Sequence, residues 1–238
     1  MDESWGVPGI VEAKNITPAG IGRLTDGELF RAITSGVRAN GQAMFPIMPY
    51  AAFNKLSDED LYSIIAYVRT LKPIDNAVSD HRLDFPMNMI VRIIPKRHTA
   101  IQSPDTSDRY EYGKYLANTA DCIDCHTRQV RGEAIKGLEF AGGFEFHLPE
   151  GTVHSANITP DEETGIGSWS ADDFAGRFRQ YASADGSTLE ALAAEYNTPM
   201  PWVAFSGMSE SDLTAIYKYL RTVPPIRNQV EKFTPNAK

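Results

Sequence analysis

The chain of 238 residues has only two cysteines, Cys122 and Cys125, and no long apolar run. A membrane-spanning helix needs about 18 or more consecutive apolar residues. The most apolar stretch, residues 85–95, is shorter than that and contains Arg92. Positive charge is also scarce, because the formal net charge is −8, and this disfavours a nucleic-acid partner. We therefore expect neither a membrane span in this chain nor binding to nucleic acid.

Two parts of the chain resemble each other. Residues 47–73 match residues 199–225 without a gap, so that Met48 corresponds to Met200 and Tyr67 to Tyr219, 152 positions later in each case. A looser match joins residues 15–33 to residues 157–178. Such self-similarity predicts a duplicated domain.

Each copy is expected to end in a helix. Ser57 and Ser209 are predicted N-caps, each followed three residues later by an aspartate. Apolar residues then recur at helical spacing and predict one inward stripe per helix. These residues are Leu61, Ile64, Ile65 and Val68 in the first copy and Leu213, Ile216, Tyr217 and Leu220 in the second. Further helices are predicted after the caps Thr25 and Ser170 and over residues 108–120.

We find no convincing strand alternation, so the predicted fold is all-α with long loops. The predicted order is an incomplete domain over residues 1–76, a connector over 77–106, a complete domain over 107–228 and a polar, extended tail over 229–238. The connector has no clear period but carries apolar residues that are expected to pack. They are Phe85, Met87, Met89, Ile90, Ile93 and Ile94.

Residues 122–126 form the pattern C-x-x-C-H, which is the attachment signature of c-type haem. Two thiols on one helical turn can each add to a haem vinyl group, and His126 can present a ring nitrogen to the iron. A zinc site would need further cysteine or histidine ligands at close spacing, and the sequence lacks them. A disulfide between Cys122 and Cys125, or two free thiols, is the simplest alternative.

Met200 is the candidate for the second axial ligand, because methionine often lies opposite histidine in electron-transfer haems. It precedes a proline in a stretch without helical pattern, and Met48 occupies the same place in the other copy. The alternative for Met200 is a core position. Met208 is the second candidate thioether. His147 and His154 would form a bis-histidine site, although we expect both to face solvent.

Four other residues are candidates for binding the cofactor. The indole N–H of Trp169 could bond a haem propionate, and Arg128 could neutralise one. Gly143, with Gly142, could let the backbone approach the haem face. Each has a plain structural alternative as a core tryptophan, a surface arginine or a turn glycine. Asn157, which begins the segment NITP, completes the set.

Several segments together resemble a class I cytochrome c domain: RYEYGKYLANTADCIDCHT, AGGFEF, NITPDEETGIGSWSADDF, MPW and MSESDLTAIYKYLRTVPP. More narrowly, the chain is similar to tandem-domain cytochromes c that include the cytochrome subunits of bacterial membrane-associated alcohol and aldehyde dehydrogenases. The resemblance implies a helical fold around covalent haem c. It also implies that the terminal helices cross at a small residue, which would set Gly113 and Tyr115 against Ile216 and Tyr219.

The first copy departs from this pattern. His126 precedes Asn157 by 31 residues, and the same spacing before Asn15 would place an attachment motif upstream of Met1. We therefore expect one haem in this chain and a first domain that is truncated, haem-free or completed by another chain. The first ten residues also lack the features of a secretory signal, so export would require a signal that was removed or lies upstream.

The resemblance implies single-electron transfer through a haem held by His126 and Met200, with no catalytic residue in this chain. The implied partners are a dehydrogenase or a quinol-oxidising complex as donor and an oxidase as acceptor. The implied location is the periplasm or the outer face of the cytoplasmic membrane. The alternatives are a haem enzyme with an open iron position and a haem-free module that binds a dehydrogenase.

Overall fold

A computed structural model describes residues 8–130, 132–148, 150–182 and 199–236. The chain divides into a first unit, Met1–Ser103, and a second unit, Pro104–Lys238. In the part of the chain that the structure describes, no helix is long and apolar enough to cross a membrane.

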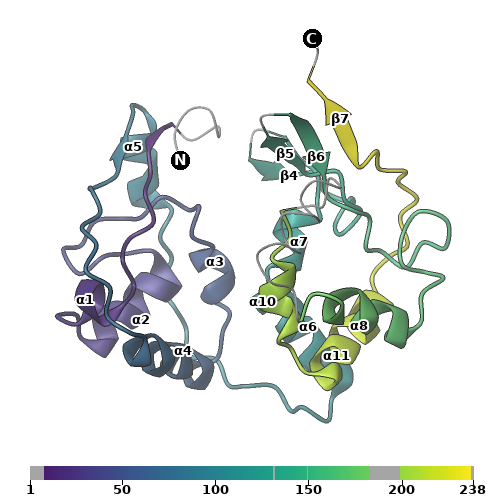
Figure 1. Ribbon diagram of the computed structural model, residues 1–238, viewed down its shortest axis with the longest axis horizontal. Coiled ribbons are helices and arrows are strands. Elements are labelled where there is room, and N and C mark those ends of the chain that lie inside the picture. The colour runs from purple at the N-terminus through teal and green to yellow at the C-terminus, as the bar shows by residue number, and fades with distance from the viewer. Residues whose placement is uncertain (1–7, 131, 149, 183–198, 237–238) are drawn as a thin grey trace. The chain divides into compact units, whose positions relative to one another are not determined.

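The first unit is built mainly of short helices (Figure 1). Its elements are β1 Gly9–Ile10, α1 Pro18–Ile21, α2 Asp26–Ser35, α3 Tyr50–Phe53, α4 Asp58–Thr70, β2 Arg82–Leu83, α5 Met87–Ile90 and the 3-10 helix Val91–Ile93. Strands β1 and β2 pair antiparallel. A small buried cluster of Ile21, Leu29 and Ile65 joins α1, α2 and α4.

The second unit combines helices with a small sheet (Figure 1). Its elements are α6 Arg109–Thr119, α7 Cys122–Cys125, β3 Gln129–Val130, β4 Glu133–Ala134, β5 Glu145–Leu148, β6 Gly151–His154, α8 Ala171–Arg179, α10 Trp202–Ser206, α11 Glu210–Leu220 and β7 Phe233–Pro235. Strands β5, β6 and β7 form an antiparallel sheet in that order. A larger core cluster includes Phe140, Phe174, Leu213 and Leu220.

The predicted helix starts are confirmed. Ser57 and Ser209 are the N-caps of α4 and α11, and each hydroxyl accepts a hydrogen bond of 3.1 Å from the backbone N–H three residues later. Thr25 and Ser170 begin α2 and α8 with full capping boxes. These side chains satisfy backbone donors that a helix start otherwise leaves unpaired.

Helices α6 and α11 lie side by side in the second unit (Figure 1). They pack against each other at Gly113, as the family resemblance implied for that residue. A Cβ atom at Gly113 would lie 2.0 Å from the carbonyl oxygen of Ala215. Only glycine therefore allows the two backbones this distance. Ala215 and Ile216 are buried by the contact, with exposed fractions of 0% and 3%.

In the second unit, a set of hydrogen bonds joins Asn157, Thr159 and Ile226 and is called the clasp below. Asn157 Oδ1 accepts from the backbone N–H of Thr159 at 2.9 Å and from its hydroxyl at 2.8 Å. Asn157 Nδ2 donates to the carbonyl of Ile226 at 2.8 Å, and the N–H of Ile226 donates to the Thr159 hydroxyl at 3.2 Å. The clasp ties the loop before α8 to the segment after α11.

The first unit contains the same clasp. Asn15 Oδ1 accepts from the N–H and the hydroxyl of Thr17 at 2.9 Å and 2.7 Å. Asn15 Nδ2 donates to the carbonyl of Ile74 at 2.8 Å, and the N–H of Ile74 donates to the Thr17 hydroxyl at 3.2 Å. The two copies therefore share tertiary hydrogen bonds as well as sequence.

The all-α prediction needs correction, because the described residues include strands. None of these strands is longer than four residues, and such strands are too short to give a clear alternation of polar and apolar residues. The tail predicted to be extended from residue 229 contributes β7, whose Phe233 pairs with Val153. Its strand character comes from pairing with β6, a contact distant in sequence.

Two predictions of burial are also wrong. In the connector, Phe85, Met89 and Ile93 are exposed by 78%, 62% and 84%, and only neighbouring residues such as Val91 are buried. In α4, Leu61 and Ile65 are buried as expected, but Ile64 is 38% exposed. Its equivalent Ile216 is buried because α6 covers α11.

We expect Gly113→Ala to destabilise the second unit by about 2 kcal/mol or more, since the added methyl group forces α6 away from α11. Gly176→Ala is the matched control: Gly176 also lies within a helix, but a Cβ there meets no atom within 4 Å. It should leave stability unchanged or raise it by roughly 0.5–1 kcal/mol. Urea denaturation of the full chain, followed by tryptophan fluorescence, measures both changes. Equal stability of the two variants would contradict the close crossing.

Candidate functional site

The C-x-x-C-H residues lie on one turn, as predicted. Helix α7 consists of Cys122–Cys125, follows closely after α6, and ends at His126, whose N–H donates to the carbonyl of Cys122 at 2.9 Å. Both cysteines are free thiols. Cys122 packs against the core cluster and Cys125 is exposed. The crossing of α6 with α11 therefore places the motif at the edge of the core.

The imidazole of His126 is oriented by the backbone. Its Nδ1 lies 2.8 Å from the carbonyl oxygen of Ala156. A carbonyl can only accept, so Nδ1 must carry a proton, and the lone pair of the neutral ring is then on Nε2. Burial lowers the pKa of His126 below its usual value, which favours the neutral ring. This is the state in which histidine binds a metal.

The two thiols are held in the protonated form. Burial raises the pKa of Cys122 to about 12, with a further contribution from the negative charge of Asp121. Although Cys125 is exposed as a residue, partial desolvation of its thiol also raises its pKa, helped by the negative charges of Asp121 and Asp124. Because the thiolate is the species that reacts in disulfide formation, these pKa shifts slow oxidation of the pair to a disulfide.

The candidate axial methionine lies against the same core. Met200 is partly buried and packs on the cluster that also contacts Cys122, and so does Met208. Helix α10 begins after Pro201, so Met200 stands in non-helical backbone, as expected. Met208 immediately precedes the N-cap of α11. Both thioethers are thus brought to the core that borders α7.

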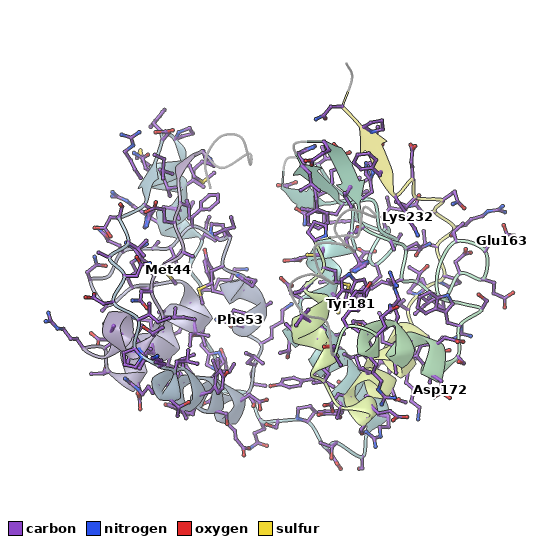
Figure 2. All side chains as sticks on the ribbon, in the orientation of Figure 1. Met44, Phe53, Glu163, Asp172, Tyr181 and Lys232 are labelled. Atoms are coloured by element: carbon purple, nitrogen blue, oxygen red, sulfur yellow. The ribbon has the colours of Figure 1, made fainter. Side chains whose placement is uncertain are left out.

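Trp169 also packs against this cluster, and its carbonyl accepts a hydrogen bond of 2.5 Å from the hydroxyl of Tyr217. Sequence reasoning missed a second tryptophan, Trp202, which stacks on Tyr181 with ring centroids 5.0 Å apart. Tyr181 is labelled in Figure 2. The guanidinium of Arg177 lies 4.9 Å from the Trp202 ring centre. The signal was available, because Trp202 closes the segment MPW.

The two glycines have different roles in the loop beside α7. Both have positive φ, +76° at Gly142 and +85° at Gly143. A Cβ atom at Gly142 would lie 2.5 Å from the carbonyl carbon of Ala156, whereas one at Gly143 would only touch the side chains of Arg128 and Asn228. Gly142 therefore lets the backbone approach the residue that orients His126. Arg128 is exposed beside Gly143.

Asn157 is 5% exposed and uses its whole amide within the protein. Besides the clasp, its Nδ2 donates to the hydroxyl of Thr164 at 3.0 Å. Because Ala156 is the preceding residue, the clasp fixes the carbonyl that accepts the hydrogen bond from His126 Nδ1. The direct cofactor contacts predicted for Asn157, Trp169 and Arg128 stay predictions.

The other candidate histidines belong to the hairpin of β5 and β6. The side chain of His147 is 67% exposed and its Nδ1 lies 3.1 Å from the hydroxyl of Thr152. His154 is partly buried, contrary to expectation, and its Nδ1 has no hydrogen-bond partner in the structure. Across the described ranges, no three or more His, Cys, Asp or Glu side chains gather as a candidate metal site.

These residues fit a covalent haem. Two unbridged thiols one helical turn apart match the two thioether bonds, and the carbonyl of Ala156 leaves His126 Nε2 for the iron. Met200 supplies a sulfur from the same core. The donor set combines imidazole and thioether, a usual pair for a haem that carries electrons.

Comparison with known proteins agrees with this site. The cytochrome c family model matches residues 110–224. The fructose dehydrogenase cytochrome subunit of Gluconobacter japonicus is 32% identical over 91% of this chain and 45% of its own length. The alcohol dehydrogenase (quinone) cytochrome c subunit of Gluconacetobacter polyoxogenes is 29% identical over 92% of this chain and 49% of its own length. The chain thus spans about half the length of these two relatives.

A third relative is matched over most of its length. It is a diheme cytochrome c-type protein of Cereibacter sphaeroides, 30% identical over 89% of this chain and 71% of its own length. The family match begins in α6 and includes the C-x-x-C-H turn, Met200 and α11. The chain belongs to the cytochrome c family.

Proposed function

We propose that this chain carries single electrons through one haem c, bound to Cys122 and Cys125 and ligated by His126 and Met200. The observation that supports it best is the 2.8 Å contact between His126 Nδ1 and the carbonyl of Ala156, which orients Nε2 for iron. When bound, haem supplies an iron centre that gains and loses one electron at a time.

The protein contributes attachment, orientation and exclusion of water. Cys122 and Cys125 would hold the haem through thioether bonds to its vinyl groups. The Ala156 carbonyl keeps the imidazole in one tautomer and raises its basicity. Phe140, Phe174 and Ile166 in the core cluster supply the apolar surroundings that help set a reduction potential.

The proposal extends to partners and location. Relatives named as cytochrome subunits of fructose dehydrogenase and of alcohol dehydrogenase (quinone) support a dehydrogenase as the electron donor. A quinol-oxidising complex or an oxidase is the other proposed redox partner. We place the protein in the periplasm or on the outer face of the cytoplasmic membrane, because c-type haem is attached there. The chain is then an electron-transfer subunit and has no catalytic residue of its own.

We also propose that the first unit is a second cytochrome c-like domain without a haem attachment motif in residues 1–103. The shared clasp supports this, as do the matched helices α2 with α8, α3 with α10 and α4 with α11. Met48 resembles Met200 in backbone as well: its carbonyl accepts from Tyr50 N–H at 2.7 Å, and that of Met200 accepts from Trp202 N–H at 2.8 Å.

A haemochrome measurement tests attachment. The full chain, produced in a host that attaches c-type haem, should show one haem per chain with the spectrum of two thioether bonds after denaturation in alkaline pyridine. Cys122→Ala combined with Cys125→Ala should remove the covalent haem, while His147→Ala should retain it. A haem-free wild-type protein, or two haems per chain, would contradict the proposal.

The axial ligand is tested by Met200→Leu, which removes the sulfur while nearly conserving volume. Loss of the thioether should lower the reduction potential, by on the order of 0.1 V within the roughly 0.8 V span that axial ligands control. It should also open the ferrous iron to carbon monoxide. Met208→Leu is the matched control in the same core and should change neither property. The reverse pattern would make Met208 the ligand.

A further inference from the structure

Among the described residues of the first unit, no helix covers one face of α4. The stripe consists of Glu59, Ser63, Ile64 and Tyr67, and all four side chains are exposed. Ile64 is 38% exposed and Tyr67 is 66% exposed. This stripe lies on a different side from Leu61 and Ile65, which are 0% and 2% exposed in the core of the unit.

The corresponding stripe of α11 shows what such a face binds. With the same offset, Ser211, Ala215, Ile216 and Tyr219 correspond to the α4 stripe. In the second unit this stripe is covered by α6: the Gly113 backbone meets Ala215 and Tyr219, and Arg109 Nη1 donates to the Ser211 hydroxyl at 2.7 Å. Ile216 is consequently 3% exposed.

The α4 stripe keeps the properties needed for the same crossing. Ser63 is small where Ala215 is small, so a facing backbone can come close. Ile64 and Tyr67 repeat Ile216 and Tyr219. Glu59 corresponds to Ser211, whose hydroxyl accepts a hydrogen bond from Arg109. The carboxylate of Glu59 would pair with an arginine in the first turn of a helix that binds to this stripe. Apolar surface, a small central residue and a negative end therefore occur in one stripe.

We propose that this stripe of α4 is a docking surface for a separate helix of the α6 kind. The helix that binds there is amphipathic, with a glycine at the crossing point, tyrosines beside it and an arginine in its first turn. A second copy of this chain is not the occupant, because its own α6 is engaged on α11. The inference extends the proposal that the first unit is cytochrome c-like, but it requires no haem.

The direct test uses a labelled, end-capped peptide of residues 107–120, added to the full haem-loaded chain while fluorescence anisotropy is recorded. The peptide should bind saturably. Ile64→Glu should weaken binding by at least about tenfold, since docking would bury an unpaired carboxylate. A peptide carrying Gly113→Val should weaken it by a similar factor. Circular dichroism checks that the variant chain stays folded, and the exposed position of Ile64 makes this the expected result.

An exchange of charges between Glu59 and the peptide shows whether the peptide binds to α4 or to α11. Glu59→Lys should weaken binding of the wild-type peptide, and a peptide with Arg109→Glu should regain it on that variant. Ser211 is the equivalent position in α11. If the peptide instead displaced α6 from α11 in the second unit, its affinity would not depend on the residue at position 59. Absence of saturable binding, or equal affinity for the Ile64→Glu chain, would overturn the proposal. So would a dimer, seen by light scattering, that Ile64→Glu dissociates. Haem content is measured separately, so failure of the electron-transfer proposal gives a different result.

Discussion

The close approach of α6 to α11 at Gly113 is the constraint on which the second unit depends. Helix α7 follows within a few residues of the end of α6, so the crossing fixes where Cys122 meets the core. The N-cap Ser209 begins α11 directly after Met208 and shortly after Met200, and both methionines pack on the same core. One backbone contact without side chains therefore brings the attachment turn and the candidate thioethers to a common apolar core.

Orientation of the candidate ligand depends on polar contacts instead. The clasp of Asn157, Thr159 and Ile226 holds the loop that begins at Ala156, and that loop presents the carbonyl to His126. Gly142 allows the loop to lie against the chain after α7. The clasp of Asn15, Thr17 and Ile74 has the same bonds in the first unit. It is therefore a property of the repeated fold and does not by itself indicate a haem.

Local chemistry made part of this structure predictable from sequence. Ser57, Ser209, Thr25 and Ser170 cap helices through bonds to residues within three positions, and C-x-x-C-H needs only one turn. Features that depend on distant partners were not predictable. Strand β7 exists through pairing with β6, and the protonation state of the candidate ligand depends on a carbonyl 30 positions away. The ring contacts of Trp202 likewise come from residues distant in sequence, Phe178 of α8 and Tyr181, although the segment MPW marks its position.

The equivalent helices α4 and α11 show most clearly that burial by distant partners is not predictable from the sequence of a helix. Helices α4 and α11 have the same cap, the same apolar spacing and equivalent isoleucines, yet Ile64 is 38% exposed and Ile216 is 3% exposed. In the second unit α6 covers this position, and no helix among the described residues of the first unit does so. Burial of apolar surface is the main favourable contribution to folding, so the contact with α6 adds stabilisation to the second unit that the described part of the first unit does not have. The difference in burial between Ile64 and Ile216 therefore follows from one helix–helix contact, independently of where haem is attached.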